Sequence, residues 1–302
     1  MNILITGGTG FIGSALTKSL TAQGHRVTVL SRSPAKVPDK CGSGVRALGD
    51  LSELKAEDRY DVVINLAGAP IFDARWTEGR KKVLIESRIG LTERLIESLS
   101  ALTVKPELLI SGSAVGFYGD QGDTVLTEQS AAQDDFAHRL CQAWETSALR
   151  AEQFGIRVCL IRTGLVLAAD GGILQRMLLP FRFGLGGRIG NGRQWMSWIH
   201  RNDWIKIART MMVERTMQGA YNATAPVPVI NREFTQTLAA CLKRPAWLPV
   251  PSWALKLTLG EMSELVLGSQ RVLPQRLLDR GFEFEYPDLK AALAQVLSAQ
   301  TG

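Results

Sequence analysis

A glycine-rich segment near the N-terminus, TGGTGFIG at residues 6–13, most strongly constrains how this chain folds. It joins a short apolar run, residues 2–6, to a helix-like stretch, residues 11–22. Glycines at positions 7, 10 and 13 allow a tight turn from strand to helix and a close approach of the backbone to a ligand. The helix start offers N–H groups and a positive dipole end, so the segment predicts a pyrophosphate site.

The same alternation of strand and helix continues along the first half of the chain. Further apolar runs follow at residues 26–30, 61–67, 108–111 and 156–161. The intervening segments, such as residues 84–102 and 136–154, are long enough for crossover helices. This pattern predicts an α/β protein with a doubly wound parallel sheet, the Rossmann fold.

The organisation changes after about residue 164. A Gly- and Arg-rich stretch covers residues 184–193, and the last third contains several prolines and two helical patterns, at residues 254–267 and 289–297. We expect residues 1–164 to form the cofactor-binding Rossmann domain, completed by about residues 198–225. Residues 165–197 and 226–302 are expected to form a smaller, mostly helical lobe that binds substrate.

The end of the second predicted strand selects the cofactor. A site for NAD usually carries an acid there to hold the ribose hydroxyls, whereas this chain has Ser31, Arg32 and Ser33. A guanidinium can pair with the 2′-phosphate that distinguishes NADP from NAD. We therefore predict NADP(H) as the cofactor. The alternative is that Arg32 is an ordinary solvated arginine.

Composition excludes several classes of protein. Of 302 residues, 45% are hydrophobic and 21% are charged, which excludes a disordered or fibrous chain. Four dispersed cysteines and three histidines give no spacing typical of a metal site, so no metal is expected. No apolar run is long enough to span a membrane and no leader pattern is present, which predicts a cytoplasmic protein without a membrane partner.

The net charge of +6 is unevenly distributed. Residues 1–161 carry 18 basic and 19 acidic side chains, whereas residues 162–302 carry 17 and 10. The excess of positive charge therefore lies in the half that contains the expected substrate lobe. This distribution favours a small anionic substrate. No nucleic-acid-binding module or dense basic run is present, so a nucleic-acid partner is not expected. The sequence leaves open whether the protein is a monomer or a homodimer.

Four further segments stand in an order that resembles the extended short-chain dehydrogenase/reductase superfamily. They are Gly49-Asp50-Leu51, Asn65-Leu66-Ala67-Gly68, Ser111-Gly112-Ser113 and residues 198–203, WIHRND. The resemblance implies a Rossmann domain that holds a dinucleotide through these segments. The expected cofactor-binding residues come from these segments, from the glycine loop and from the end of the second strand. They are Gly7, Thr9, Gly10, Phe11, Ile12, Gly13, Ser31, Arg32, Asp50, Leu51, Leu66, Ala67, Gly68 and Ser111.

More narrowly, NLAGAPI, SAVGFYGD and GSQRV resemble epimerase family proteins, also described as NAD-dependent epimerase/dehydratase. That subgroup carries a C-terminal domain of unassigned function, here at about residues 247–297. The superfamily's catalytic pair is a tyrosine followed four residues later by a lysine. When Glu145 is matched to the glutamate that commonly follows this pair, the two positions fall on Ala137 and Cys141. The resemblance therefore implies an atypical member that lacks the pair.

Two residues are candidates to replace the missing catalytic pair. Ser113 matches the residue that hydrogen-bonds a substrate oxygen in the superfamily; alternatively, it caps a loop. Tyr118, five residues later, could donate a proton to a reduced oxygen; alternatively, it packs beside the cleft.

Three arginines are candidates for contact with an anionic substrate. Arg88 lies where relatives often have an asparagine, although it could instead pair with Glu145 or another carboxylate. Arg188 and Arg193 belong to an arginine-rich stretch that could clamp phosphate or carboxylate groups, or could be a solvated surface.

Three functions remain possible from the sequence. The first is an NADP(H)-dependent oxidoreductase that acts on an anionic small molecule. The second is a nucleotide-sugar epimerase or dehydratase, which requires a base that the sequence lacks. The third is a non-catalytic NADPH sensor or partner-binding protein.

Overall fold

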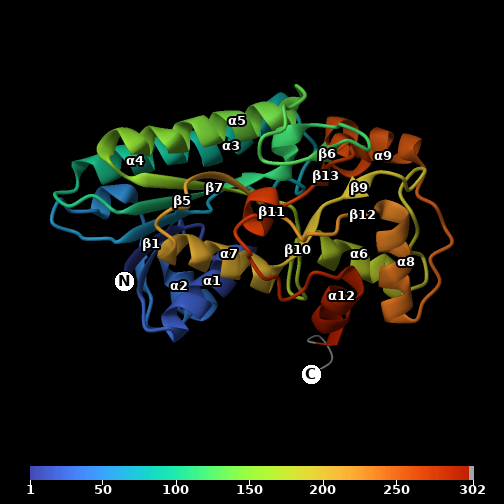
Figure 1. Ribbon diagram of the computed structural model, residues 1–302, viewed down its shortest axis with the longest axis horizontal. Helices are drawn as coiled ribbons and strands as arrows, with labels where there is room; N and C mark the ends of the chain where they lie inside the picture. Colours follow the sequence, from blue (N-terminus) through green and yellow to red (C-terminus); the bar gives the residue numbers. More distant parts are fainter. Residues whose placement is uncertain (299–302) are drawn as a thin grey trace.

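A computed structural model describes residues 1–298 of the chain. Its centre is a seven-stranded sheet in the order β11-β7-β5-β4-β1-β2-β3, in which every neighbouring pair is parallel (Figure 1). The strands are β1 (Asn2–Thr6), β2 (Arg26–Leu30), β3 (Arg46–Leu48), β4 (Val62–Asn65), β5 (Leu108–Ala114), β7 (Arg157–Thr163) and β11 (Gly219–Ala223). Strand order reverses at β1, where consecutive strands diverge to β2 on one side and β4 on the other. Ligands of such sheets bind at this point, beyond the carboxyl ends of the strands.

Helices cover both faces of the sheet. One face carries α1 (Phe11–Ala22), α2 (Val37–Cys41) and α7 (Arg201–Val213), and the other carries α3 (Glu78–Ile85), α4 (Leu91–Ala101) and α5 (Phe136–Leu149) (Figure 1). The expected fold class, a doubly wound parallel sheet with a smaller helical lobe, is confirmed. Within residues 136–154, a segment long enough for a crossover helix, α5 ends at Leu149 and a 3₁₀ segment, Arg150–Phe154, follows it.

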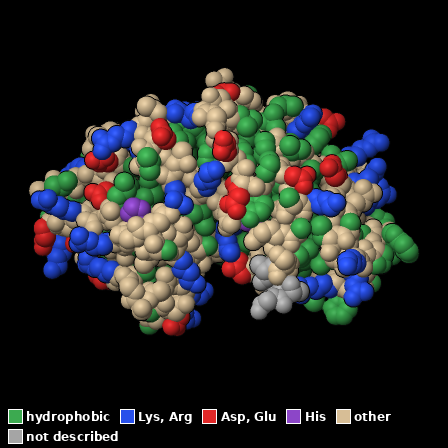
Figure 2. Space-filling view, turned by 60° about the horizontal axis from the view of Figure 1, so that its bottom comes forward, with side chains coloured by type: hydrophobic (Ala, Val, Ile, Leu, Met, Phe, Trp, Pro, Cys, Tyr) green, Lys and Arg blue, Asp and Glu red, His purple; other side chains and the backbone are tan. Residues whose placement is uncertain are grey.

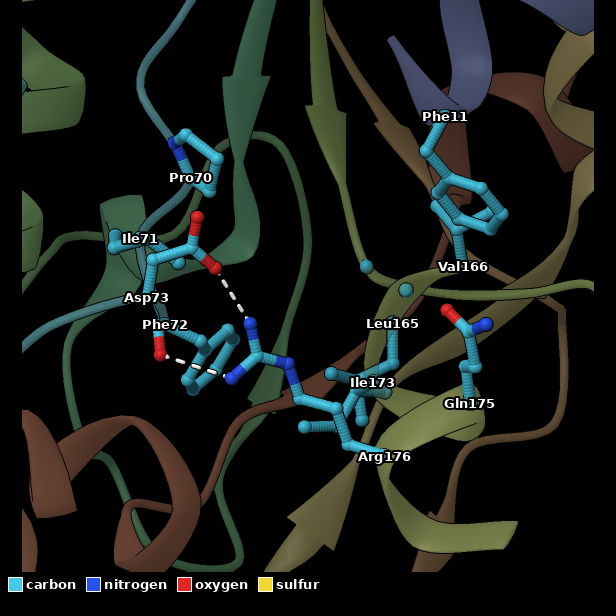
Figure 3. Close-up of a pocket in the computed structure, with 12 residues that line it drawn as sticks. Phe11, Pro70, Ile71, Phe72, Asp73, Leu165, Val166, Ile173, Gln175 and Arg176 are labelled. Atoms are coloured by element: carbon cyan, nitrogen blue, oxygen red, sulfur yellow. Dashed lines mark hydrogen bonds and ion pairs between the residues drawn. The ribbon is translucent and has the colours of Figure 1, made fainter. Parts of the chain in front are cut away.

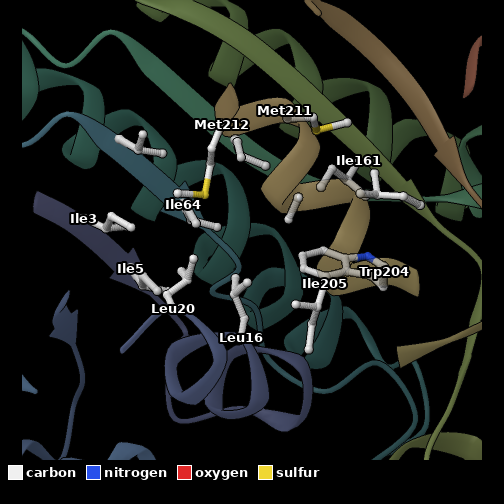
Figure 4. Close-up of a cluster of buried hydrophobic side chains, with 14 of the residues drawn as sticks. Ile3, Ile5, Leu16, Leu20, Ile64, Ile161, Trp204, Ile205, Met211 and Met212 are labelled. Atoms are coloured by element: carbon white, nitrogen blue, oxygen red, sulfur yellow. The ribbon is translucent and has the colours of Figure 1, made fainter. Parts of the chain in front are cut away.

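Alternating side chains of each strand build the two halves of the core. Ile3, Ile5 and Ile64 face α1 and α7, where they pack in one cluster with Leu16 and Trp204 (Figure 4). Leu4, Val63 and Leu109 face the opposite side and pack with Leu95 and Leu99 of α4. Burial of each such side chain stabilises the fold by about 1.5–3 kcal/mol, so this period-two alternation holds the sheet between its helical layers.

Residues 84–102, another segment long enough for a crossover helix, do not form one continuous α-helix. Between α3 and α4, residues Glu86–Gly90 form a π-helical turn. Hydroxyl groups bond the backbone on both sides of it, from Ser87 Oγ to the Leu84 carbonyl and from Thr92 Oγ1 to the Arg88 carbonyl. An inserted residue of this kind re-aims side chains, and such turns are frequent at functional sites.

The smaller lobe is built from residues after β7, together with one short segment that precedes it. Its strands form two-stranded pairs: β8 (Leu165–Leu167) with β10 (Trp198–His200), β9 (Trp195–Met196) with β12 (Val229–Ile230), and β6 (Val125–Leu126) with β13 (Arg271–Val272). Its helices are α6 (Gly172–Arg182), α8 (Asn231–Leu242), α9 (Ser252–Leu259), α10 (Glu264–Leu267), α11 (Gln275–Leu278) and α12 (Leu289–Ser298). Trp198, Phe234 and Leu293 lie in its core.

Residues 1–298 contain neither a candidate membrane-spanning helix nor a candidate metal site. None of the helices described there combines the length and the apolar character that crossing a membrane requires. Within the same residues, no group of three or more His, Cys, Asp and Glu side chains is arranged to hold a metal ion.

Candidate cofactor and substrate site

The glycine loop between β1 and α1 closes tightly against the end of β4. Gly7 has a left-handed φ of 70°, and its carbonyl accepts a hydrogen bond from the Gly10 N–H at 2.9 Å. A Cβ on Gly7 would lie 2.7 Å from the Leu66 carbonyl, and one on Gly13 only 2.2 Å from the Gly7 oxygen. Side chains are therefore excluded at both positions. The loop backbone itself becomes the surface that a ligand can approach.

The start of α1 offers unoccupied backbone donors. Its N-cap is Gly10, no side chain caps it, and its first turn has no acidic residue. The first N–H groups of a helix have no intrahelical partner, and here nothing negative competes for them. The geometry of Thr9, Phe11, Ile12 and the three glycines therefore suits a pyrophosphate.

At the end of β2, one serine is buried and the following arginine is free. The Ser31 N–H donates to the Leu48 carbonyl at 2.9 Å, and Ser31 Oγ accepts from the Ser33 N–H at 3.2 Å. Arg32 is exposed and forms no hydrogen bond or ion pair with any residue in the range 1–298. Its guanidinium is therefore available to an external anion, and no acid follows the strand to repel one.

The Gly49-Asp50-Leu51 segment has a visible structural role. Asp50 caps the 3₁₀ turn Leu51–Glu53, with its Oδ1 accepting from the Ser52 N–H at 2.9 Å, and Glu53 Oε1 accepts from the Asp50 N–H in return. These hydrogen bonds to Ser52 lower the pKa of the Asp50 carboxyl. The side chain of Leu51 is buried in the core. The adenine contact expected of this segment stays a prediction.

A buried polar network ties the carboxyl ends of three central strands together. Asn65 Oδ1 accepts from Thr6 Oγ1 at 2.6 Å, and Asn65 Nδ2 donates to Thr92 Oγ1 at 2.8 Å and to Ser111 Oγ at 3.5 Å. Trp144 Nε1 of α5 donates to the same threonine at 3.1 Å. Each member is satisfied inside the protein, which fixes the sheet edge that Leu66, Ala67 and Gly68 follow.

Arg88 lies in the π turn, directly against the segment that follows β4. Its Nη2 donates to the Ala69 carbonyl at 3.1 Å, and a Cβ on Gly68 would lie 2.9 Å from the guanidinium carbon. The guanidinium also stacks 5.3 Å from the Trp144 ring. Its pKa is lowered because the group is largely desolvated, and none of the described carboxylates pairs with it. The alternative of a pair with Glu145 is therefore excluded.

Glu145 instead pairs with Arg162 on the neighbouring strand β7. Both side chains are buried, and Arg162 Nε and Nη2 lie 2.8 Å from Glu145 Oε1 and Oε2, respectively. Ser113 is also buried, and its Oγ donates to Glu145 Oε1 at 2.6 Å. The serine hydroxyl proton is thus committed to a carboxylate, and only the oxygen lone pairs remain for a ligand.

The structure corrects the expectation for Tyr118. This side chain has no exposed surface; its hydroxyl donates to Asn222 Oδ1 at 2.7 Å and accepts from Arg162 Nη1 at 3.1 Å. Burial raises the pKa of the Tyr118 phenol. A hydroxyl enclosed in this way cannot reach a substrate, and the Tyr118 side chain packs with Leu126 and Val272.

A cavity of about 400 Å³ opens between the Rossmann domain and the smaller lobe (Figure 3). Phe11 and Val166 form one side, and the Pro70–Phe72 region after β4 forms the other (Figure 3). Arg176 of α6 reaches across to Asp73, with Nη2 2.5 Å from Oδ1, and also donates to the Phe72 carbonyl at 3.1 Å. The remaining lining residues are Gly164, Leu165, Gly172, Ile173 and Gln175. The walls are thus mainly apolar, and the ion pair between Arg176 and Asp73 spans the cavity.

The sequence matches a known family over most of this fold. Residues 3–223 match the model of the NAD dependent epimerase/dehydratase family, and residues 250–296 match a domain of unknown function, DUF1731. The chain belongs to the NAD dependent epimerase/dehydratase family. The expected resemblance, including the C-terminal domain of unassigned function, is confirmed.

Three known proteins show how far the similarity extends. The epimerase family protein YfhF of Bacillus subtilis is 42% identical over 99% of this chain and 98% of its own. The human epimerase family protein SDR39U1, crystallised with NADPH, is 35% identical, covers 99% of both chains and has a TM-score of 0.90. UDP-glucuronic acid 4-epimerase of Bacillus cereus has a TM-score of 0.79 at 15% identity, which shows a shared fold alone.

In this member of the family, helix α5 carries neither partner of the superfamily's catalytic pair. Ala137 and Cys141, at the two matched positions, are both buried. Burial and the nearby Glu145 carboxylate raise the pKa of the Cys141 thiol to about 12, so it is a neutral group at pH 7. The adjacent His138 is held by the Phe117 carbonyl, 2.6 Å from Nδ1. Ala137 and Cys141 therefore cannot replace the tyrosine and lysine as an acid/base pair.

The structure separates Arg188 and Arg193 from the cavity of Figure 3. Their loop is paired with residues after α8, with the Gly190 N–H donating to the Val250 carbonyl and the Val250 N–H to the Arg188 carbonyl, both at 2.8 Å. Arg188 lines a second cavity on α8, and Arg193 is exposed. Neither arginine lines the first cavity, and a contact of either one with an anionic substrate stays a prediction. Arg176, which was not among the expected substrate contacts, lines the first cavity instead.

Proposed function

We propose that this protein is an NADPH-dependent oxidoreductase that acts on a small molecule bound in the cavity of Figure 3. The choice of cofactor depends on one observation, the exposed and unpaired Arg32 at the carboxyl end of β2. A guanidinium at this position favours a ribose 2′-phosphate, and no acid beside it opposes one. The crystal structure of the human relative with NADPH supports this choice.

The residues present fit a dinucleotide. The positions of Gly7 and Gly13 leave no room for a Cβ, and the uncapped start of α1 can bind a pyrophosphate. When bound, NADPH supplies a hydride from its nicotinamide ring. The end of β4, with Leu66, Ala67 and Gly68, is where the family resemblance places the ribose next to that ring.

Arg88 is our candidate for the fixed positive charge of the site. It lies against Gly68 and Ala69, and its guanidinium stacks on the ring of Trp144 from α5. Because a guanidinium stays protonated, it can orient a substrate oxygen by hydrogen bonding without acting as a base. Water then provides the proton that a carbonyl or double bond gains on reduction.

The substrate is proposed to have an apolar body and one anionic group. Phe11, Ile71, Phe72, Leu165 and Val166 line the cavity, so the larger part of a ligand would lie against hydrocarbon. Arg176 is partly neutralised by Asp73, whereas Arg88, beside Gly68 and Ala69, has no carboxylate partner among the described residues. A nucleotide-sugar epimerase, by contrast, needs a base to begin the oxidation, and Ala137 and Cys141, at the matched positions on α5, cannot serve as one.

A panel of small carbonyl compounds and α,β-unsaturated acids tests the proposal. Purified protein with NADPH should consume the reduced cofactor with at least one apolar anionic compound. Ile173→Trp should fill the cavity and abolish this turnover while leaving NADPH affinity unchanged. Binding of NADPH without oxidation across the whole panel would contradict an oxidoreductase.

Replacement of Arg88 tests the role of the fixed charge. Loss of a charged hydrogen bond of about 1.5–3 kcal/mol predicts that Arg88→Met lowers kcat/KM by about 10- to 150-fold. Arg88→Lys should recover part of the loss, whereas Arg94→Met, at an exposed ion pair on α4, should have no effect. Equal kcat/KM for wild type and Arg88→Met would remove Arg88 from the mechanism.

One observation favours a second function, an NADPH sensor. The hydroxyls of Ser113 and Tyr118 are both engaged inside the protein, which leaves neither as a proton donor to a ligand. In a sensor, NADPH would raise the melting temperature and change the affinity for a partner. Partner binding that does not respond to NADPH would exclude this function.

A further inference from the structure

A second cavity lies on the smaller lobe and shares no lining residue with the first. Its volume is about 240 Å³, and it is lined by Arg188, Arg232, Thr235, Gln236, Ala246 and Trp247. Arg232, Thr235 and Gln236 lie on one face of α8, because residues three and four apart in a helix are neighbours. The end of the molecule that contains this lobe carries many hydrophobic and basic side chains (Figure 2).

A buried hydroxyl in this cavity lacks a partner. Thr235 is only 2% exposed, yet its Oγ1 has no hydrogen bond with any of the residues described. Buried polar groups are nearly always hydrogen-bonded, because burial without a partner costs the full desolvation of the group. A threonine placed in this way fits a site whose ligand supplies the missing partner.

Two guanidinium groups of the cavity lining converge on one backbone carbonyl, that of Asn191. Arg188 Nη1 and Arg232 Nη2 both donate to the Asn191 carbonyl, at 3.2 and 3.4 Å. Across residues 1–298, neither arginine forms an ion pair with a carboxylate. Two like charges held this close without neutralisation favour a bound anion, and guanidinium groups match phosphate geometry in particular.

An exposed indole completes the cavity. Trp247 is 86% exposed and lines the same wall as Ala246. A large aromatic side chain at the surface presents a face on which a planar ring can stack. The small volume fits a phosphate group near the two guanidiniums, with a ring at the opening against the indole.

We propose that this second cavity binds a mononucleotide, independently of the dinucleotide site. The phosphate contacts Arg188 and Arg232, the Thr235 hydroxyl gains its missing hydrogen-bond partner, and the base stacks on Trp247. The Gln236 amide adds a donor and an acceptor at the same helix face. Arg188 therefore serves this site rather than the substrate cavity.

Calorimetric titration of AMP into full-length protein saturated with NADPH tests the proposal, since the cofactor then blocks the dinucleotide site. One AMP should bind, and inorganic phosphate and adenosine should each bind at least tenfold more weakly. Arg188→Ala and Arg232→Ala should each weaken AMP binding at least tenfold, whereas Arg193→Ala, at an exposed arginine of the same loop, should not. Trp247→Ala should weaken AMP binding about tenfold and leave phosphate binding unchanged.

Three outcomes would overturn the proposal. They are no AMP binding at millimolar concentration, AMP binding that survives loss of both arginines, and phosphate binding as tight as that of AMP. Phosphate binding as tight as AMP binding would show that the cavity is a simple anion site and does not recognise a nucleotide. Thermal melts of each variant, compared with wild type, would separate lost binding from lost folding.

Discussion

Arg162 and Glu145 form a buried, two-bond ion pair that joins strand β7 to helix α5, with both nitrogen–oxygen distances at 2.8 Å. Ser113 donates a third hydrogen bond to the same carboxylate, and Tyr118 accepts one from the same guanidinium. The ion pair therefore fixes the hydroxyls of Ser113 and Tyr118, the two residues that the sequence suggested for catalysis. It also gives these buried polar groups hydrogen bonds, without which their burial would be costly.

Removal of one partner of this pair should destabilise the protein strongly. Arg162→Met leaves the Glu145 carboxylate buried without a counter-charge, and we expect the free energy of unfolding to fall by about 3–5 kcal/mol. The double variant Arg162→Met with Glu145→Leu should recover part of the loss, because it removes the unpaired charge. Urea denaturation measures both values.

The matched control is the exposed pair between Arg94 and Glu86. Solvent screens that pair, so Arg94→Met should leave the urea midpoint nearly unchanged. A similar small effect of Arg162→Met would show that the buried pair does not stabilise the fold.

The glycine loop should tolerate no side chain where it contacts α1. In Gly13→Ala the new Cβ would lie 2.2 Å from the Gly7 oxygen, so the loop must shift. We expect at least a tenfold loss of NADPH affinity, measured by fluorescence titration. Gly44→Ala, where no atom lies within 4 Å of the new Cβ, is the control and should bind NADPH as wild type does. Equal affinities for both variants would show that the cofactor does not depend on this loop.

The parts that the sequence could predict are those fixed by local pattern. The glycines at positions 7, 10 and 13 specify the turn between β1 and α1. The helical periodicity of residues 11–22 specifies α1, which begins and ends where expected. Strand β3, Arg46–Leu48, was missed because three residues are too few to show alternation. The π turn at Glu86–Gly90 was missed because its hydroxyl bonds leave the helical pattern unchanged.

The site was harder to predict because its decisive contacts are distant in sequence. Tyr118 seemed to face the cleft because it follows Ser113 closely, but its hydroxyl bonds Asn222, 104 residues later. Asp73 and Arg176 are separated by 103 residues, and only the packing of α6 brings them together. The periodicity of a sequence carries only local information and does not indicate such distant pairs. The sequence therefore located the cofactor loop well and the substrate cavity poorly.

Histidine 200 should make stability depend on pH. Its Nδ1 accepts from the Asn202 N–H at 3.2 Å and its Nε2 lies 2.9 Å from Gln295 Oε1, an arrangement that needs a neutral ring. Burial lowers the pKa of His200 below its usual value of 6.5. Between the lowered pKa and 6.5 the unfolded chain binds more protons than the folded one, so the free energy of unfolding should fall as pH drops through this window.

His200→Asn isolates this contribution, because asparagine keeps an acceptor at the start of α7 but cannot take up a proton. Urea unfolding between about pH 5 and 8 should give a shallower acid slope for the variant than for wild type. Identical slopes would mean that His200 titrates alike in both states.

The central claim is that Arg32 makes this protein select NADPH. Calorimetric titration of NADPH and NADH into the wild-type protein and into Arg32→Asp tests it most directly. We expect the wild type to bind NADPH at least tenfold more tightly than NADH, because the guanidinium pairs with the 2′-phosphate. Arg32→Asp should reverse the order, because its carboxylate repels the phosphate and accepts from the ribose hydroxyls. Equal binding of the two cofactors by the wild type would contradict the account.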